Sequence, residues 1–311
     1  MNLLFRFNMK RPAKEMGDNM KIILSRKGFD RSTGGFASPI ILDNGNVEEG
    51  KLLSLPIPIT QTQENNREEG ISYNKLRFNG KSLGNIIQQL SNDRFICEHA
   101  HLDPDLDRNR YGHQDGWKPV FGQTGGAQTY LENRDVKEGD LFLFFGWFRR
   151  TEYKGDRLCY MKPSKEGKDL HVIFGWLQVG EIIEVDKDKI PSWLNYHPHV
   201  LNAGKKPYSK NNTIYVAADN LSFNGLSYKK GGGIFSHFKQ ALQLTAPEEN
   251  ARSHWSLPKW LCGNFIEGKW PYRKGHLPFD SGGRRQEFVF DVSEQNKQKA
   301  IKWLRNIFED H

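Results

Sequence analysis

Cysteine is scarce in this chain of 311 residues, which contains only Cys97, Cys159 and Cys262. The three lie far apart and no C-x-x-C pair occurs. The spacing therefore argues against a cysteine-based zinc site and against a disulfide framework. We expect each cysteine to be a small buried hydrophobe rather than a nucleophile.

Long apolar runs are also absent, and none approaches the roughly 20 residues of a membrane span. Residues 1–19 are basic and mildly apolar. They lack the continuous apolar core and the small-residue cleavage site of a signal peptide. We expect residues 1–19 to be an N-terminal extension that can be disordered, and the protein to be cytoplasmic without membrane contact.

The common signatures of nucleotide-dependent enzymes are missing as well. No G-x-x-x-x-G-K-[ST] motif occurs, and no G-x-G-x-x-G motif follows a predicted strand. The G-x-S-x-G elbow, the kinase motifs and H-E-x-x-H are absent too. The sequence therefore gives no support for nucleoside triphosphate hydrolysis or for dinucleotide redox chemistry.

Aromatic residues and positive charge are plentiful. Eight Trp and twenty Phe indicate an ordered body, and the formal net charge of +8 suits a polyanionic partner. The candidate DNA contacts are basic residues in turn-like, Gly-containing or polar stretches: Arg26, Arg149, Arg150, Lys229, Lys230, Arg284 and Arg285.

A loop rich in glycine and hydroxyl groups follows the buried run Ile22–Leu24. Loops at strand ends carry chemistry because the strand fixes them while their backbone can face a ligand. One interpretation is a solvated loop with an anion nest. The other is half of an active site, with Asp30 ionised and Arg26 and Lys27 facing phosphate. Ser25, Lys27, Gly34 and Gly35 are then candidate substrate contacts.

The segment HAHLDPDLD concentrates His99, His101, Asp103, Asp105 and Asp107. Histidine and carboxylate side chains could bind a metal, but no helix fixes their spacing, and we predict no metal site. Acid/base work by one ionised and one protonated carboxylate is an alternative. An equally good interpretation is a polar loop in which the Asp side chains accept hydrogen bonds from the backbone of their own turns.

A second polar segment, FGQTGGAQTYL, contains Gln123 and Gln128. Their amide groups can form the paired hydrogen bonds that read base edges or sugar hydroxyls. We count both with His99 and His101 as candidate substrate contacts.

The secondary-structure pattern favours an α+β class. Apolar runs at 141–148 and 171–185 predict a hairpin, and 213–217, 242–245 and 286–292 predict further strands. Apolar spacing predicts short helices after Ser82 and Ser293. We expect residues 20–311 to form a single elaborated domain, with a curled mixed or antiparallel sheet, short flanking helices and long functional loops.

Ten segments together resemble a known family. They are KIILSRKGFD, LLSLPIP, HLDPDL, W-x-P-x-FGQ-x-x-GAQ-x-YL, V-x-EGDLFLFFGWFR, HVIFGWLQVGE, NTIYVA, LQLTAP, LP-x-W and GRRQEFVFD. They are similar to the third class of nucleotide modification-associated domains, from about Lys21 to Asp291. That family is associated with hypermodified DNA bases in phages and bacteria.

The resemblance implies a phage-defence DNA glycosylase that flips out a glucosylated hydroxymethylcytosine and leaves an abasic site. Such an enzyme needs an ionised carboxylate and a shaped pocket, but no cofactor and no covalent nucleophile. Our candidate for the carboxylate is Asp30, with Asp103 or Asp105 in reserve. The expected partner is double-stranded phage DNA with modified bases, and no obligatory protein partner is evident.

Other functions stay open at this point. A non-catalytic reader of modified DNA would need the same basic face and pocket. An enzyme that adds or alters the modification would need a donor site, and no donor motif is visible. A lyase that uses Lys27 as a Schiff-base amine is a variant of the glycosylase hypothesis.

Overall fold

The computed structural model describes residues 20–42, 49–65, 68–163, 166–262 and 286–309. The predicted extension at 1–19 and the candidate DNA contacts Arg284 and Arg285 lie outside these residues. None of the helices in the described part of the chain has the length and apolar character needed to cross a bilayer.

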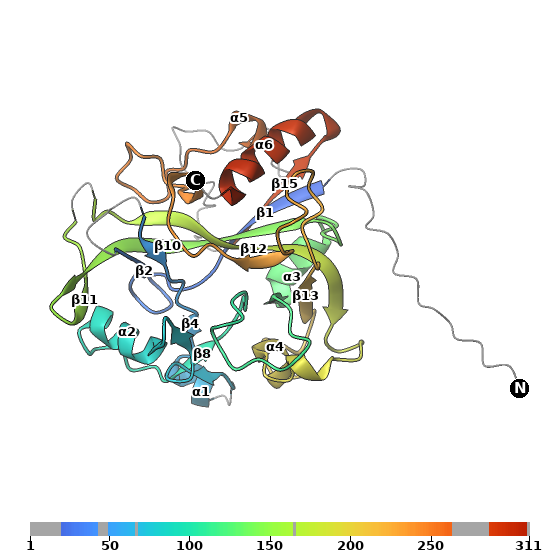
Figure 1. Cartoon of the computed structure of the whole chain (residues 1–311). Helices are drawn as coiled ribbons and strands as arrows, with labels where there is room; N and C mark the ends of the chain where they lie inside the picture. The colour runs from blue at the N-terminus through green and yellow to red at the C-terminus, as the bar shows by residue number, and fades with distance from the viewer. Residues whose placement is uncertain (1–19, 43–48, 66–67, 164–165, 263–285, 310–311) are drawn as a thin grey trace, which may run out of the picture.

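A large mixed sheet forms the centre of the molecule (Figure 1). Its main path runs through β15 (Glu287–Val292), β1 (Met20–Arg26), β10 (Leu141–Lys154), β12 (Leu170–Glu184), β13 (Thr213–Ala217) and β9 (Val120–Gln123). At its margins pair β2 (Ser38–Ile41), β3 (Lys51–Leu52), β11 (Arg157–Tyr160) and β14 (Gly232–Ile234). This architecture confirms the predicted α+β class and the mixed sheet.

Smaller elements cover the sheet on both sides. A second sheet contains β4 (Ile57–Pro58), β8 (His99–His101) and β5 (Ile71–Ser72), and β6 (Arg77–Phe78) pairs with β7 (Lys81–Ser82). The helices are α1 (Gln61–Asn65), α2 (Leu83–Ser91), α3 (Gly125–Glu132), α4 (Pro198–Leu201), α5 (Lys259–Cys262) and α6 (Lys297–Phe308). Short 3-10 turns are η1 (Ser192–Leu194), η2 (Gln240–Leu242) and η3 (Glu294–Asn296). In Figure 1, α5 and α6 lie on one side of the large sheet, and α2, α4 and the small sheet lie on the other.

The β10–β12 hairpin is the predicted one, and its residues 141–148 and 170–179 are buried. Continuous burial suits central strands covered on both faces. The register shifts between Phe144 and Phe145. A Cβ at the adjacent Gly146 would lie 2.8 Å from the Lys27 carbonyl oxygen, so glycine allows the β1 backbone to approach closely here.

The sheet is strongly curled without being closed. Glu287 and Gln123 belong to strands at opposite ends of the main path, yet Gln123 Nε2 donates to Glu287 Oε1 at 2.8 Å. Lys27 Nζ likewise lies 4.6 Å from the centre of the Phe121 ring. The two ends of the sheet therefore meet at a buried cluster of side chains.

Both predicted helices form. Ser82 Oγ accepts from Asn85 N and caps α2, whose buried face contains Leu83, Ile86, Ile87 and Leu90. In α6 the predicted residues Ile301, Leu304, Ile307 and Phe308 are buried. Ser293 precedes η3, and its side chain forms no capping bond.

Three details of the expected secondary structure are wrong. Strand β1 continues through Ser25 and Arg26, because Arg26 N bonds the Gln286 carbonyl beside it. Residues 97–130 show no helical or strand period in the sequence and are expected to be irregular, but they contain β8, β9 and most of α3. Residues 242–245 form no strand, since Leu242 ends the η2 turn and Gln243 and Thr245 make only isolated bridges.

Candidate functional site

Asp30 lies in a tight turn directly after β1. Its Oδ1 accepts four hydrogen bonds of 2.8–2.9 Å, from the backbone N–H and the hydroxyl of both Ser32 and Thr33. The backbone closes the same turn, because Gly35 N donates to the Asp30 carbonyl oxygen at 2.9 Å. We call residues 30–35 the Asp30 turn; it fixes the carboxylate without help from distant segments.

The Asp30 carboxylate is held in its charged form. Partial burial opposes ionisation, but the bonds from Ser32 and Thr33 outweigh it and lower the pKa of Asp30 below its ordinary value. The second oxygen, Oδ2, lies 3.9 Å from Arg26 Nη2. Arg252 also interacts electrostatically with Asp30. An anion surrounded by cations and hydroxyls is therefore present at neutral pH.

A surface hollow of about 460 Å³ borders the Asp30 turn. It is lined by Gly34, Gly35, Phe36, Ala37, Leu90, Ser91, Arg94, Phe95, Trp147, Arg149 and Tyr160. Four aromatic rings and two guanidinium groups offer stacking faces and positive charge to one ligand. We call it the rim hollow, and its volume lies within the about 300–1,000 Å³ typical of ligand pockets.

Trp147 and Arg149 both line the hollow. They lie on the same face of β10, because residues two apart on a strand point to the same side. Trp147 is stacked against Arg252, whose guanidinium carbon lies 4.1 Å from the ring centre. The Trp147 indole nitrogen is buried and has no hydrogen-bond partner among the described residues. Arg149 pairs with Asp169 at 2.6 Å. Arg150 lies instead over the Phe238 ring, away from the hollow.

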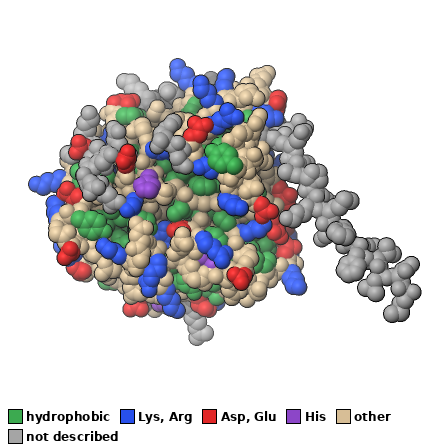
Figure 2. Space-filling model, in the orientation of Figure 1, with side chains coloured by type: hydrophobic (Ala, Val, Ile, Leu, Met, Phe, Trp, Pro, Cys, Tyr) green, Lys and Arg blue, Asp and Glu red, His purple; other side chains and the backbone are tan. Residues whose placement is uncertain are grey.

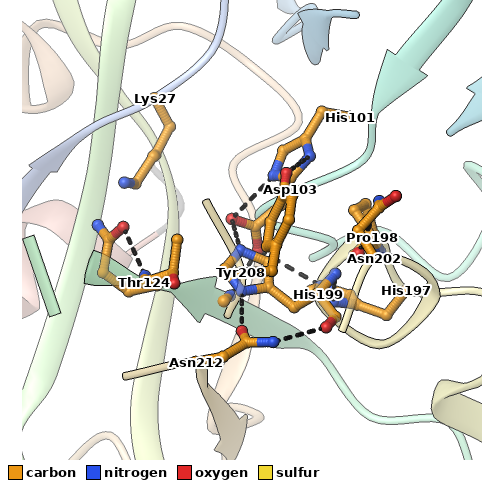
Figure 3. A network of polar contacts seen from close by, with 12 residues as sticks. Lys27, His101, Asp103, Thr124, His197, Pro198, His199, Asn202, Tyr208 and Asn212 are labelled. Atoms are coloured by element: carbon orange, nitrogen blue, oxygen red, sulfur yellow. Dashed lines mark hydrogen bonds and ion pairs between the residues drawn. The ribbon is translucent and has the colours of Figure 1, made fainter. Parts of the chain in front are cut away.

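Asp103 is the centre of a second site, which is buried. His101 Nε2 and His199 Nε2 each lie 3.8 Å from its Oδ2, and His197 Nε2 lies 3.4 Å from its Oδ1. Gly122 N donates to Oδ1 at 2.6 Å. Figure 3 shows these imidazoles arranged around the carboxylate. We call His101, Asp103, His197 and His199 the Asp103 cluster.

Charge is divided unevenly within this cluster. Burial alone would raise the pKa of Asp103, but His101 and His197 lower it far below its ordinary value. Burial works against protonation of His101, yet its bonds to Asp103 and Glu68 raise its pKa to about 9. Burial lowers the pKa of His199 to about 3. The carboxylate and His101 therefore form a buried ion pair beside a neutral His199.

His101, Asp103 and His199 could hold a metal ion, because each offers one ligand atom and these atoms lie within 4.8 Å of one another. A small opening of about 30 Å³ adjoins Asp103. That opening also touches Gly28. The segment between β1 and Asp30 therefore lies between the buried cluster and the rim hollow.

Asp105, the other reserve carboxylate, is buried in its own network. Its Oδ2 lies 2.7 Å from His113 Nε2 and accepts from the Tyr196 hydroxyl and from Trp117 Nε1. These aromatic side chains leave 1% of the residue exposed. Asp105 is thus surrounded by protein groups rather than by a ligand-sized space.

Ser25, Lys27 and Gln123 meet at Glu287, a residue that the sequence did not single out. Their side chains bond Glu287 Oε1 at 3.3, 3.0 and 2.8 Å. Lys27 is 6% exposed, so it lies inside the molecule rather than toward solvent. The structure thus brings three predicted substrate contacts together around a buried carboxylate.

The remaining predicted contacts are dispersed. Gln128 is buried in α3, where it accepts from the Tyr215 hydroxyl and donates to Glu132. His99 is half-buried on β8. Lys229 and Lys230 precede β14. Figure 2 shows Lys and Arg interspersed with Asp and Glu, so no continuous basic band crosses that face.

Several site residues were missed from the sequence. His197 and His199 lie in the segment YHPH. Two histidines at this spacing indicate a pair of imidazoles that could act together. Trp147 lies in the apolar run 141–148 and is not among the candidate site residues, although aromatic residues of this kind could stack on a flipped base. Glu287 had no signal, since its partners lie 164 and 260 residues away.

Comparison with known proteins agrees with the resemblance in the sequence. A model of the family described as nucleotide modification associated domain 3 matches residues 21–291. No curated protein and no solved structure was found to match the chain. The family match covers almost the whole described fold and sets the protein in the context of nucleotide modification. The chain belongs to the nucleotide modification associated domain 3 family.

Proposed function

We propose that this protein is a DNA glycosylase that removes a glucosylated hydroxymethylcytosine from phage DNA as a defence. The observation that carries the proposal is the ionised Asp30 carboxylate beside an aromatic, positively charged hollow. Family membership adds the link to modified nucleotides. The net charge of +8 favours a polyanionic partner.

In the proposed reaction the target nucleotide is flipped out of the duplex and its base enters the rim hollow. Trp147 and Phe95 offer stacking faces for the ring. Arg94 and Arg149 provide charge for phosphate or for sugar hydroxyls. The aromatic walls suit the base, and the polar walls suit the hydroxyl groups of a glucosyl group attached to it.

Asp30 stabilises the positive charge that develops on the deoxyribose as the bond from C1′ to the base nitrogen breaks. The electron pair of that bond leaves with the base. A water oxygen bonds to C1′, its proton passes to the Asp30 carboxylate and then to the departing base. The products are the free modified base and an abasic site.

Water is favoured over Lys27 as the nucleophile. A Schiff-base lysine must reach C1′ as a neutral amine. Lys27 is buried, its Nζ lies 3.0 Å from Glu287 Oε1, and it does not line the rim hollow. Borohydride should therefore trap no covalent adduct between protein and DNA. A trapped adduct that is lost in Lys27→Ala would establish the lyase mechanism instead.

The test is incubation of the full-length protein with duplexes that contain unmodified, hydroxymethylated or glucosylated hydroxymethylated cytosine. Alkali and a denaturing gel then reveal abasic sites as strand breaks. We expect breaks only in glucosylated DNA, lost in Asp30→Ala and kept in Asp156→Ala, a control in the exposed β10–β11 turn. Breaks that survive Asp30→Ala would contradict the role of Asp30. A stable complex without breaks would identify a reader.

A further inference from the structure

We propose that His101, Asp103 and His199 bind one divalent transition-metal ion that fastens distant segments of the fold together. The ligand atoms lie within 4.8 Å of one another, and the two nearest nitrogen–oxygen distances to Asp103 Oδ2 are 3.8 Å. Two imidazoles and a carboxylate form a donor set suited to zinc, iron or manganese. Tetrahedral bonds of about 2.0–2.1 Å place ligand atoms about 3.3 Å apart. Each nitrogen must therefore move about 0.5 Å closer to Oδ2, and any pair as far apart as 4.8 Å must close by about 1.5 Å.

Hydrogen bonds orient both imidazoles for this role. His199 Nδ1 lies 2.6 Å from Asn212 Oδ1, which can only accept, so Nδ1 carries the ring proton. Nε2 then keeps its lone pair on the side of Asp103. Figure 3 shows His199 between Asn212 and Asp103. Such outer partners are characteristic of metal-binding histidines.

His101 has an equivalent arrangement. Tyr208 donates its single phenolic proton to Glu68 Oε1 at 2.8 Å. The contact of 3.2 Å between the Tyr208 oxygen and His101 Nδ1 therefore needs the proton on Nδ1. Nε2 of His101 faces Asp103, and an ion bound there would displace the proton that this nitrogen carries in the metal-free ion pair. Both imidazoles thus direct Nε2 at the same carboxylate oxygen.

His197 supplies an independent observation. Its Nδ1 accepts from the His199 backbone N–H, which leaves the ring proton on Nε2. That Nε2 is fully buried, points at Asp103 Oδ1 from 3.4 Å and has no hydrogen-bond partner among the described residues. A buried donor without a partner is costly. A metal ion bound to Oδ2 would fix the orientation of the Asp103 carboxylate. Oδ1 could then accept a hydrogen bond from His197 Nε2.

The burial of the ligands favours a structural role for the ion, with water in the fourth position that three protein ligands leave open. His199 and Asp103 are 2% and 5% exposed, and the adjoining space of about 30 Å³ is too small for a nucleotide. The ligands come from β8, from the segment after it and from α4, and Gly122 N joins β9 to the same carboxylate. The ion would hold the small sheet and α4 against the edge of the large sheet. This inference does not depend on which base the protein acts on.

The experiment uses the full-length protein, purified without chelators and analysed for bound metals by mass spectrometry. Chelator-treated protein is then titrated with Zn²⁺, and with Co²⁺ while visible absorption is recorded. We expect one ion per chain, cobalt ligand-field bands that Zn²⁺ removes, and a melting temperature that rises with Zn²⁺ concentration. Wild-type protein without bound metal, cobalt bands or a melting shift would overturn the proposal.

Variants locate the ion. His199→Gln and Asp103→Asn should weaken Zn²⁺ binding by at least 10-fold, whereas His254→Gln should not. His254 is a matched control because its imidazole lies 2.7 Å from the Glu249 carboxylate in another loop. Circular dichroism checks that each variant is folded. Undiminished binding in both cluster variants would overturn the proposal, and if they fail to fold, the wild-type cobalt spectrum decides.

Discussion

The Asp30 turn and the Asp103 cluster both keep a carboxylate ionised, but they do so with different partners. Asp30 is 21% exposed, and its donors lie two and three residues away on the same loop. Asp103 is 5% exposed, and its imidazole partners come from β8 and from the α4 segment. One carboxylate is local and accessible, and the other joins distant segments.

This difference in setting implies a difference in role. A carboxylate beside a hollow can meet a substrate, whereas a carboxylate enclosed by three imidazoles stabilises the arrangement of the chain. The polar neighbours of both carboxylates lower the pKa, so ionisation by itself does not identify the catalytic group. The two carboxylates differ in their exposure to solvent and in whether their partners come from the same loop or from distant segments.

The largest expected effect is on stability. In metal-free protein, Asp103→Ala should lower the free energy of unfolding by about 3–5 kcal/mol, because it removes the buried carboxylate that faces His101. Asp30→Ala should cost only about 1 kcal/mol, since its donors lie near solvent. Urea denaturation of both variants measures the difference. Equal losses would contradict the division into an accessible and a structural carboxylate.

Removal of the stacking face in the hollow should affect binding next. Trp147→Ala should weaken binding of glucosylated DNA by about 1–3 kcal/mol, or roughly 5- to 150-fold, through lost base stacking. Trp147→Phe keeps a ring and should lose less. Fluorescence anisotropy with modified and unmodified duplexes measures the change. Equal affinity of wild-type and Trp147→Ala protein for modified DNA would place the base elsewhere.

Two glycine substitutions sharpen the comparison further. A Cβ at Gly122 would lie 2.3 Å from the His199 ring, so Gly122→Ala should displace the imidazole and cost about 1–3 kcal/mol. At Gly35 a Cβ meets nothing within 4 Å, and only the backbone angle φ of +84° opposes it, at about 1 kcal/mol. Thermal unfolding compares the two. Gly122→Ala should be the less stable, and the opposite order would contradict the packing of His199 on β9.

The smallest effect is a shift with pH. Because the pKa of Asp30 is below its ordinary value of 3.8, Asp30 should cause no loss of excision above about pH 4. Its contribution to stability is present above the unfolded pKa and is lost as pH falls through the folded pKa. Thr33→Val removes one hydroxyl donor and should move the acid limb of the rate profile to higher pH. An unchanged limb would mean that another group sets it.

Local structure was the part most readily predicted from the sequence. The α2 stripe and the β10–β12 hairpin follow from apolar spacing over neighbouring residues. The Asp30 turn is predictable for the same reason, since its donors are its neighbours. The 242–245 run was taken for a strand because composition alone does not supply a pairing partner.

Long-range contacts could not be predicted in this way. Nothing near Asp103 in the sequence identifies His197 and His199 as its partners, because curling of the fold brings them together. The meeting of Lys27 and Gln123 at Glu287 depends on the approach of the two ends of the sheet. A single sequence shows which residues are present, but it does not show which distant residues lie next to one another in the fold.

The most direct test of the central claim compares Asp30→Asn with Asp103→Asn in single-turnover excision of glucosylated hydroxymethylcytosine. Both changes preserve shape and remove charge. We predict that Asp30→Asn is folded, binds modified DNA and loses excision by about 10²–10⁴-fold. Asp103→Asn should melt at a lower temperature but retain excision where it is folded. A folded, inactive Asp103→Asn beside an active Asp30→Asn would contradict the account and place the chemistry in the buried cluster.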